Sequence, residues 1–168
     1  TSINAWAFSY CSQLSSIYIP KITSLSGCFG NCGIETIDMP QILSLSGTFS
    51  NCSKLAYVNL PNCTYLNAYT FTYCSKLAYV SIPACRYISQ SVFFGCSNLQ
   101  TISLPVCSYL GYSAFYSCSK LSSIYLMSNS IVSIYNSQIF MYTPIQQSSY
   151  LGYFGSIYVP NSLLASYK

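Results

Sequence analysis

The chain of 168 residues has the length of one ordinary domain, and 52% of its residues are hydrophobic, which is ample for a core. Only 5% are charged, and the net charge of +4 comes from six scattered bases against Glu35 and Asp38, with no basic run that would indicate a nucleic-acid-binding protein. No stretch of about 20 residues is predominantly apolar, so the sequence predicts no membrane span.

The chain is a tandem repeat. Each copy opens with Phe-x-x-Cys and runs through alternating apolar residues to a proline, or to a methionine in the sixth copy. The phenylalanines are 20 to 22 residues apart, and a degenerate seventh copy begins at Phe140. A fixed period of this length indicates a solenoid. The six copies are Phe8–Pro20, Phe29–Pro40, Phe49–Pro61, Phe71–Pro83, Phe93–Pro105 and Phe115–Met127.

Each copy contains the pattern of two short strands. In the third copy Leu55, Val58 and Leu60 are predicted to point inward, with Tyr57 and Asn59 between them pointing outward. After the proline, two apolar positions flank two polar ones, which predicts a second short strand. The same alternation places Leu77 and Leu99 inward and Lys76 outward.

The ten cysteines fall mainly into two columns. One is the Phe-x-x-Cys position, and the other is two residues after the proline, where the first two copies carry Ile22 and Ile42 instead. A position that accepts Ile or Cys favours a small buried hydrophobic side chain. Buried, unpaired thiols are therefore the favoured interpretation for most of the ten.

Other roles for the cysteines have less support. Stacked strands hold side chains of one column wider apart than the roughly 3.8 Å between Cβ atoms that a disulfide needs. The chain has no His and no Cys-x-x-Cys, so it offers neither a zinc ligand set nor a base to activate a thiol. Ten cysteines are by count typical of a secreted disulfide scaffold, so the redox compartment stays open.

The repeat resembles a known family. The run TSINAWAFSYCSQLSSIYIP, from Thr1 to Pro20, is similar to the unit of BspA-like bacterial leucine-rich repeats. The resemblance implies an α/β repeat fold, a right-handed leucine-rich-repeat solenoid that is β-rich with a short helical turn at Phe-x-x-Cys. We expect about six to seven repeats over residues 1–160, the first truncated because Thr1 stands mid-repeat, with further sequence upstream.

The last residues resemble the closing strand and short helix of that family. Asn161 is a favourable N-cap residue, and residues 161–168 are predicted to begin a C-terminal capping helix.

Outward positions of the repeats form columns rich in tyrosine. Tyr57 and Tyr79 share one column, and Tyr65, Tyr87 and Tyr109 share another, with Arg86 beside it. A single such tyrosine is explained by strand preference and by packing on its neighbour. The face as a whole favours recognition, because Tyr provides a large contact area at low entropy cost. These six residues are the candidate ligand-binding site.

The resemblance implies a bacterial, extracellular or cell-surface adhesion module that binds a host or microbial protein or glycan. The alternative is a structural spacer or self-assembling fibre subunit with end-to-end self-association. The sequence shows no acid–base pair or phosphate loop, so we expect no enzyme, no catalytic residue, no cofactor and no metal.

Overall fold

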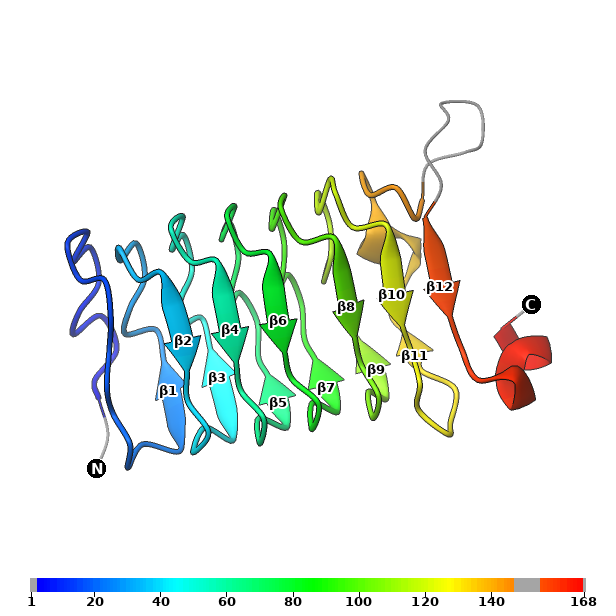
Figure 1. Cartoon of the computed structure of the whole chain (residues 1–168), viewed down its shortest axis with the longest axis horizontal. Helices are drawn as coiled ribbons and strands as arrows, with labels where there is room; N and C mark the ends of the chain where they lie inside the picture. Colours follow the sequence, from blue (N-terminus) through cyan, green and yellow to red (C-terminus); the bar gives the residue numbers. More distant parts are fainter. Residues whose placement is uncertain (1–2, 147–154, 168) are drawn as a thin grey trace.

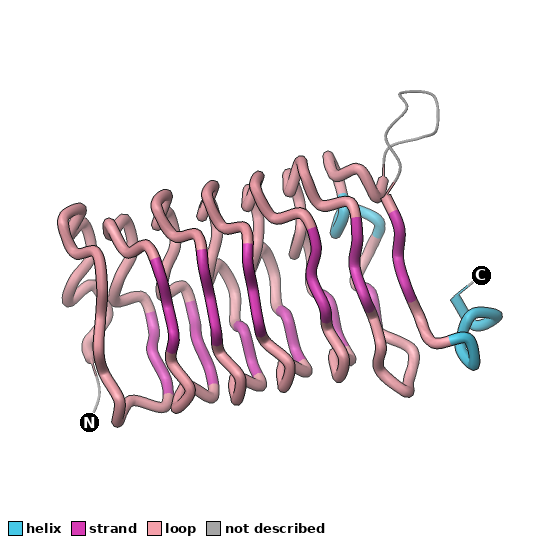
Figure 2. The backbone as a smooth tube through the Cα atoms, in the orientation of Figure 1, coloured by secondary structure: helices cyan, strands magenta, loops and turns pink. Residues whose placement is uncertain are grey.

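The computed structural model describes residues 3–146 and 155–167, which form a β-solenoid whose coils stack along its long axis (Figure 1). Each regular coil contributes two short strands, separated by a corner at the proline, and then a run of turns that contains Phe-x-x-Cys (Figure 2). Strand pairing is parallel and in register: each residue pairs with its equivalent in the next coil, as Tyr57 does with Tyr79. The sequence prediction of a β-rich repeat solenoid is therefore confirmed.

The strands that follow the prolines form one continuous six-stranded sheet, here called the long sheet. Its strands are β1 (Ser24–Ser26), β3 (Ser44–Ser46), β5 (Tyr65–Leu66), β7 (Tyr87–Ile88), β9 (Tyr109–Leu110) and β11 (Ser133–Ile134).

The strands that precede the prolines form a second row, here called the split row, because it consists of two three-stranded sheets. Strands β6 and β8 lie side by side where the two sheets meet but share no ladder pairing (Figure 1). The strands are β2 (Thr36–Asp38), β4 (Tyr57–Asn59) and β6 (Tyr79–Ser81), then β8 (Thr101–Ser103), β10 (Ser123–Tyr125) and β12 (Ser156–Tyr158).

A column of stacked phenylalanines runs through the core. Rings from successive coils lie nearly parallel, with centroids 5.2 to 5.9 Å apart, from Phe8 to Phe140. Offset stacking at this separation is favourable beyond the area it buries. Phe140 stacks on Phe115 at 5.8 Å, so the degenerate seventh copy continues the column as predicted.

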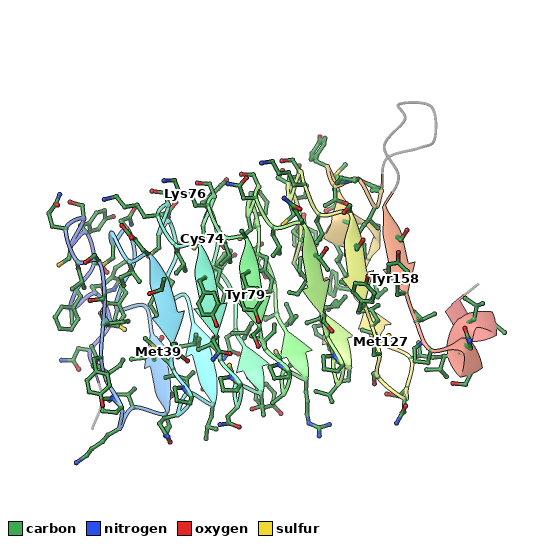
Figure 3. All side chains as sticks on the ribbon, in the orientation of Figure 1. Met39, Cys74, Lys76, Tyr79, Met127 and Tyr158 are labelled. Carbon is green, nitrogen blue, oxygen red and sulfur yellow. The ribbon has the colours of Figure 1, made fainter. Side chains whose placement is uncertain are left out.

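The predicted inward and outward positions are confirmed. Leu77 and Leu99 are fully buried, whereas Lys76, which precedes Leu77, is exposed. Figure 3 shows Lys76 at the outer edge of the solenoid, above Cys74 and Tyr79. Lys76 is thus solvated, and the leucines complete the core around the phenylalanines.

Across the described residues the structure has turns but no helix at Phe-x-x-Cys, so the predicted helical turn is not confirmed. In each regular coil two residues four positions apart have left-handed φ, for example Asn51 at 59° after Gly47 at 55°. Left-handed residues interrupt a right-handed helix. The backbone bonds here are single local turns, as from Cys52 N–H to Phe49 O at 3.2 Å, and bonds from coil to coil, as from Phe49 N–H to Thr70 O at 3.0 Å. The helices of the described residues are two 3₁₀ segments, η1 (Ser137–Phe140) and η3 (Asn161–Tyr167).

The segment η3 occupies the region predicted to begin a capping helix. Most of its described side chains are exposed, and it lies beyond β12 at one end of the solenoid (Figure 1). Within residues 3–146 and 155–167, no helix is long and apolar enough to cross a membrane.

Candidate functional site

The first tyrosine column lies on the outer face of the split row. Tyr57 and Tyr79 are paired residues of β4 and β6, and their rings stack with centroids 4.8 Å apart and planes 5° apart. Both side chains stay substantially exposed, at 38% and 52%. The parallel, in-register pairing of the strands therefore builds a two-ring aromatic platform.

The second column lies on the outer face of the long sheet. Tyr87 and Tyr109 stack at 4.4 Å with planes 6° apart, and Tyr65 meets Tyr87 at 6.1 Å with a tilt of 39°. The pKa of Tyr109 is raised, mainly because the ring is partly removed from water. Its hydrogen bond and electrostatic interaction with Tyr87 raise this pKa further. Arg86, next to Tyr87, is exposed. The structure thus brings together the four residues predicted for this column.

The two columns belong to two different sheets. Leu66 of the long sheet and Val58 of the split row are both fully buried in one core, so the outer faces of the two sheets point away from that core in different directions. The candidate site is therefore two separate tyrosine surfaces rather than one face.

A third tyrosine pair was missed from the sequence. Tyr125 and Tyr158, paired in β10 and β12, stack at 4.4 Å with planes 8° apart (Figure 3 labels Tyr158). They are 33 residues apart rather than the usual 20 to 22, because the chain between them is longer than one repeat. Only the shared motif Ser-Ile-Tyr, at both strands, could have indicated the pair.

The surface beside Tyr79 is hollowed at the junction of the split row. A depression of about 560 Å³ lies between β6 and β8, with Tyr79, Gln100, Thr101 and Ser103 among its lining residues. In the next coil the short side chains of Thr101 and Ser103 follow, so the tyrosine platform ends at this depression.

All ten cysteines are free thiols, and each lies in the described part of the chain. Nine are buried, which confirms the interpretation of most of them as unpaired core residues, and Cys11 in the first copy is exposed. No three His, Cys, Asp or Glu side chains gather into a metal-binding group among the described residues.

The two cysteine columns differ in their hydrogen bonds. Thiols of the Phe-x-x-Cys column donate to a phenylalanine carbonyl of the preceding coil, as Cys74 Sγ does to Phe49 O at 3.2 Å. Post-proline thiols reach only the carbonyl two residues on, as Cys63 Sγ does to Tyr65 O at 3.4 Å. The first column holds Cys in all six regular copies and Thr143 in the degenerate seventh, whereas the second column also holds Ile.

Burial suppresses thiol reactivity. Removal from water raises the pKa of Cys52 to about 12 and that of Cys63 to about 11. The thiolate is the nucleophilic form, so these groups are poor nucleophiles at neutral pH. Their role in the described structure is to fill the core.

Comparison with known families agrees with this arrangement. The family model described as "BspA type Leucine rich repeat region (6 copies)" matches residues 1–84 and 45–158. The chain belongs to this family. Comparisons with curated proteins and with solved structures gave no match.

Within this BspA-type solenoid the columns are of two kinds. The family pattern accounts for the buried Phe, Cys and Leu columns, which repeat in nearly every copy. The position of Tyr57 carries Thr36 and Thr101 in other coils, so the tyrosine columns cover only some of the coils.

Proposed function

We propose that this chain is a non-enzymatic recognition module, working outside the cell or at its surface, that binds a protein or glycan through its stacked tyrosine columns. The observation that carries the proposal is the pairing of exposed tyrosine rings in register, Tyr57 on Tyr79 and Tyr87 on Tyr109, on a surface with very few charges. Repeats of the BspA type, used in surface recognition and adhesion, are consistent with it.

Stacking prepares the tyrosines for binding. A ring held against its neighbour has already lost part of its rotational freedom, so less entropy is lost when a partner contacts it. The phenol hydroxyl remains available as donor and acceptor at the outer end of each ring. Paired rings thus offer apolar area and directed hydrogen bonds together.

Binding through these columns is expected to depend weakly on salt. Arg86 is the charged residue in the second column, and the first column has Asn59 and Ser81 as outward neighbours. With few charges to screen, added salt has little to act on.

The test is an array of host proteins and glycans probed with the whole chain. We expect Tyr57→Ser/Tyr79→Ser or Tyr65→Ser/Tyr87→Ser/Tyr109→Ser to remove the signal, with Lys76→Ala as the exposed control. Ser16 and Ser24 occupy equivalent positions in the first copies, so the substitutions have internal precedent. Unchanged binding by both column variants would exclude the tyrosine columns.

Self-assembly is the second candidate. In the described structure β12 is the edge strand of its sheet and exposes Ile157 and Tyr158. Unprotected edge strands can pair with another chain. Light scattering separates the two functions: a fibre subunit forms particles that grow with concentration, and a recognition module stays small.

A further inference from the structure

Another aromatic surface lies where two coils have a shorter loop than the others. The phenylalanine of each turn usually stands five positions after the last inward residue of the second strand, as Phe71 does after Leu66. In two successive coils the spacing is only four, from Leu25 to Phe29 and from Leu45 to Phe49. Two adjacent coils are therefore one residue shorter at the same point, between the second strand and the phenylalanine.

The residues at this point occupy one left-handed column. It contains Trp6 with φ 67°, Gly27 with 59°, Gly47 with 55° and Tyr69 with 61°. Backbone bonds tie these coils together, for example Trp6 N–H to Gly27 O at 2.8 Å. The two shortened coils carry glycine, and the longer coils on either side carry a large aromatic residue.

The result is a hollow of about 540 Å³ with aromatic walls. Trp6 and Tyr10 line it from one side and Tyr69 from the other, and Gly27 and Gly47 form part of its lining between them. A Cβ built on Gly27 or Gly47 would meet other atoms only at van der Waals distance, 3.8 Å or more, so the glycines themselves leave the floor of the hollow low. We name this hollow the glycine trough.

The trough presents polar groups but no charge. Asn31, Asn51 and Ser50 line it together with the aromatic residues, and no Asp, Glu, Lys or Arg is among its lining residues. The hydroxyl of Tyr69 accepts a hydrogen bond from Gln90 Nε2, which fixes that wall. Trp6 is 71% exposed and Tyr10 is 72% exposed, so both rings remain available to a ligand.

The aromatic walls are kept at a conformational cost. A left-handed backbone is unfavourable for bulky residues and is readily adopted by Gly and Asn. At the positions equivalent to Trp6 and Tyr10 the next coil has Gly27 and Asn31. Trp6 and Tyr10 therefore stand where other residues would suit the fold better, which is a feature of functional sites.

We infer that the glycine trough binds a neutral oligosaccharide. Aromatic rings contact the apolar faces of sugar rings, and amide and hydroxyl groups meet their hydroxyls, which matches the lining of the trough. Its walls are three coil spacings apart, about 14 Å, which suits a short oligosaccharide rather than a single ring. The absence of charge in the lining disfavours sialylated or sulfated sugars.

This inference goes beyond the proposed function, because it assigns a ligand class to a second surface of the chain. The site is separate from the tyrosine columns, since none of Tyr57, Tyr79, Tyr65, Tyr87 or Tyr109 lines the trough. Failure of one proposal therefore leaves the other standing.

The experiment uses Trp6, the only tryptophan of the chain, as its reporter. A glycan array of neutral oligosaccharides, with sialylated and sulfated counterparts, is first probed with the whole chain. The neutral sugar with the strongest signal is then titrated while tryptophan emission is recorded. We expect saturable change in emission, and about tenfold weaker binding in Tyr69→Ser, which loses one stacking contact.

Matched variants separate binding from folding. Trp6→Gly and Tyr10→Asn introduce the residues of the next coil, and Tyr69→Ser introduces the residue found at Ser91 and Ser113, so thermal unfolding should be unchanged or shifted upward. On the array, Trp6→Gly is expected to lose the neutral-sugar signal. Tyr142→Asn is the control, since Tyr142 has the same left-handed geometry but lies outside the trough.

Three results would overturn the inference. The first is that no neutral oligosaccharide binds the wild-type chain. The second is binding that Trp6→Gly and Tyr69→Ser leave unchanged. The third is neutral-sugar binding that is lost in Tyr79→Ser but kept in Tyr69→Ser, which would assign the sugar to the tyrosine columns instead.

Discussion

The interior and exterior columns of this solenoid follow different rules. Inside, the positions of Phe49, Cys52 and Leu55 carry the same residue types in nearly every copy, and their rings and thiols stack in the core. Outside, the column of Tyr57 changes from Thr to Tyr to Ser between coils. An interior residue must fit the identical residue above and below it, whereas packing places no such requirement on an exterior residue.

The cysteines show how fine this distinction is. Both columns are buried, yet only the Phe-x-x-Cys thiol donates a hydrogen bond across the coil boundary, as Cys96 Sγ does to Phe71 O at 3.2 Å. The post-proline position requires only a buried hydrophobic side chain of suitable volume. Burial by itself therefore does not show which core residue can be replaced.

The largest effect is expected from alkaline pH. Burial raises the pKa of Cys52 and Cys85 to about 12, whereas an unfolded thiol titrates near its ordinary value of about 8.5. Below that value both states are protonated and the stability is complete. Above it the unfolded chain loses protons that the folded chain keeps, so stability falls as pH rises through the folded pKa.

Urea denaturation between pH 7 and pH 11 checks this expectation. Tyr and Lys titrate in the same range, so the control is Cys63→Ile/Cys85→Ile/Cys107→Ile, which carries the residue found at Ile22 and Ile42. The triple variant should lose less stability than wild type over this range. Equal pH dependence of the two proteins would show that these three buried thiols do not contribute.

Truncating an interior leucine is the next largest perturbation. Leu77→Ala and Leu99→Ala should each lower the free energy of unfolding by about 2–5 kcal/mol, because a fully buried side chain leaves a cavity. Lys76→Ala, one residue away and exposed, should change it by less than about 0.5 kcal/mol. Comparable losses at residues 76 and 77, measured by urea denaturation, would contradict the assignment of inside and outside.

The two thiol columns should respond differently to substitution. Cys74→Val removes the hydrogen bond to Phe49 O and should cost about 1 kcal/mol, whereas Cys63→Ile should cost less. Chemical denaturation of the two variants measures the difference. If Cys63→Ile lowers the free energy of unfolding more than Cys74→Val does, side-chain volume and not the thiol hydrogen bond determines stability at these positions.

Thiol accessibility offers a smaller test of the same interior. Titration of the folded chain with a thiol reagent should find few reactive groups, with Cys11 first, because the other nine are buried. Denaturation without reductant should bring the count close to ten. Disulfides in a non-reducing peptide map would contradict the assignment of free thiols.

The sequence predicted the interior well and the exterior less completely. The repeat period and the alternation of apolar residues predicted that Leu77, Leu99 and most of the cysteines are buried, because equivalent residues of stacked coils have the same burial. They did not reveal the left-handed turns, since Tyr10 and Tyr73 are not residue types that indicate positive φ. Nor did they reveal the break between β6 and β8, because both strands have the same apolar pattern as their neighbours.

The central claim is that exterior columns carry recognition while interior columns carry stability. The most direct measurement compares binding and thermal unfolding in one pair of variants, Tyr57→Ser/Tyr79→Ser and Tyr65→Ser/Tyr87→Ser/Tyr109→Ser, against the partner found by the array. We predict that at least one variant loses binding while its melting temperature stays close to that of the wild type. Full affinity in both variants, or loss of binding only together with loss of the fold, would contradict the claim.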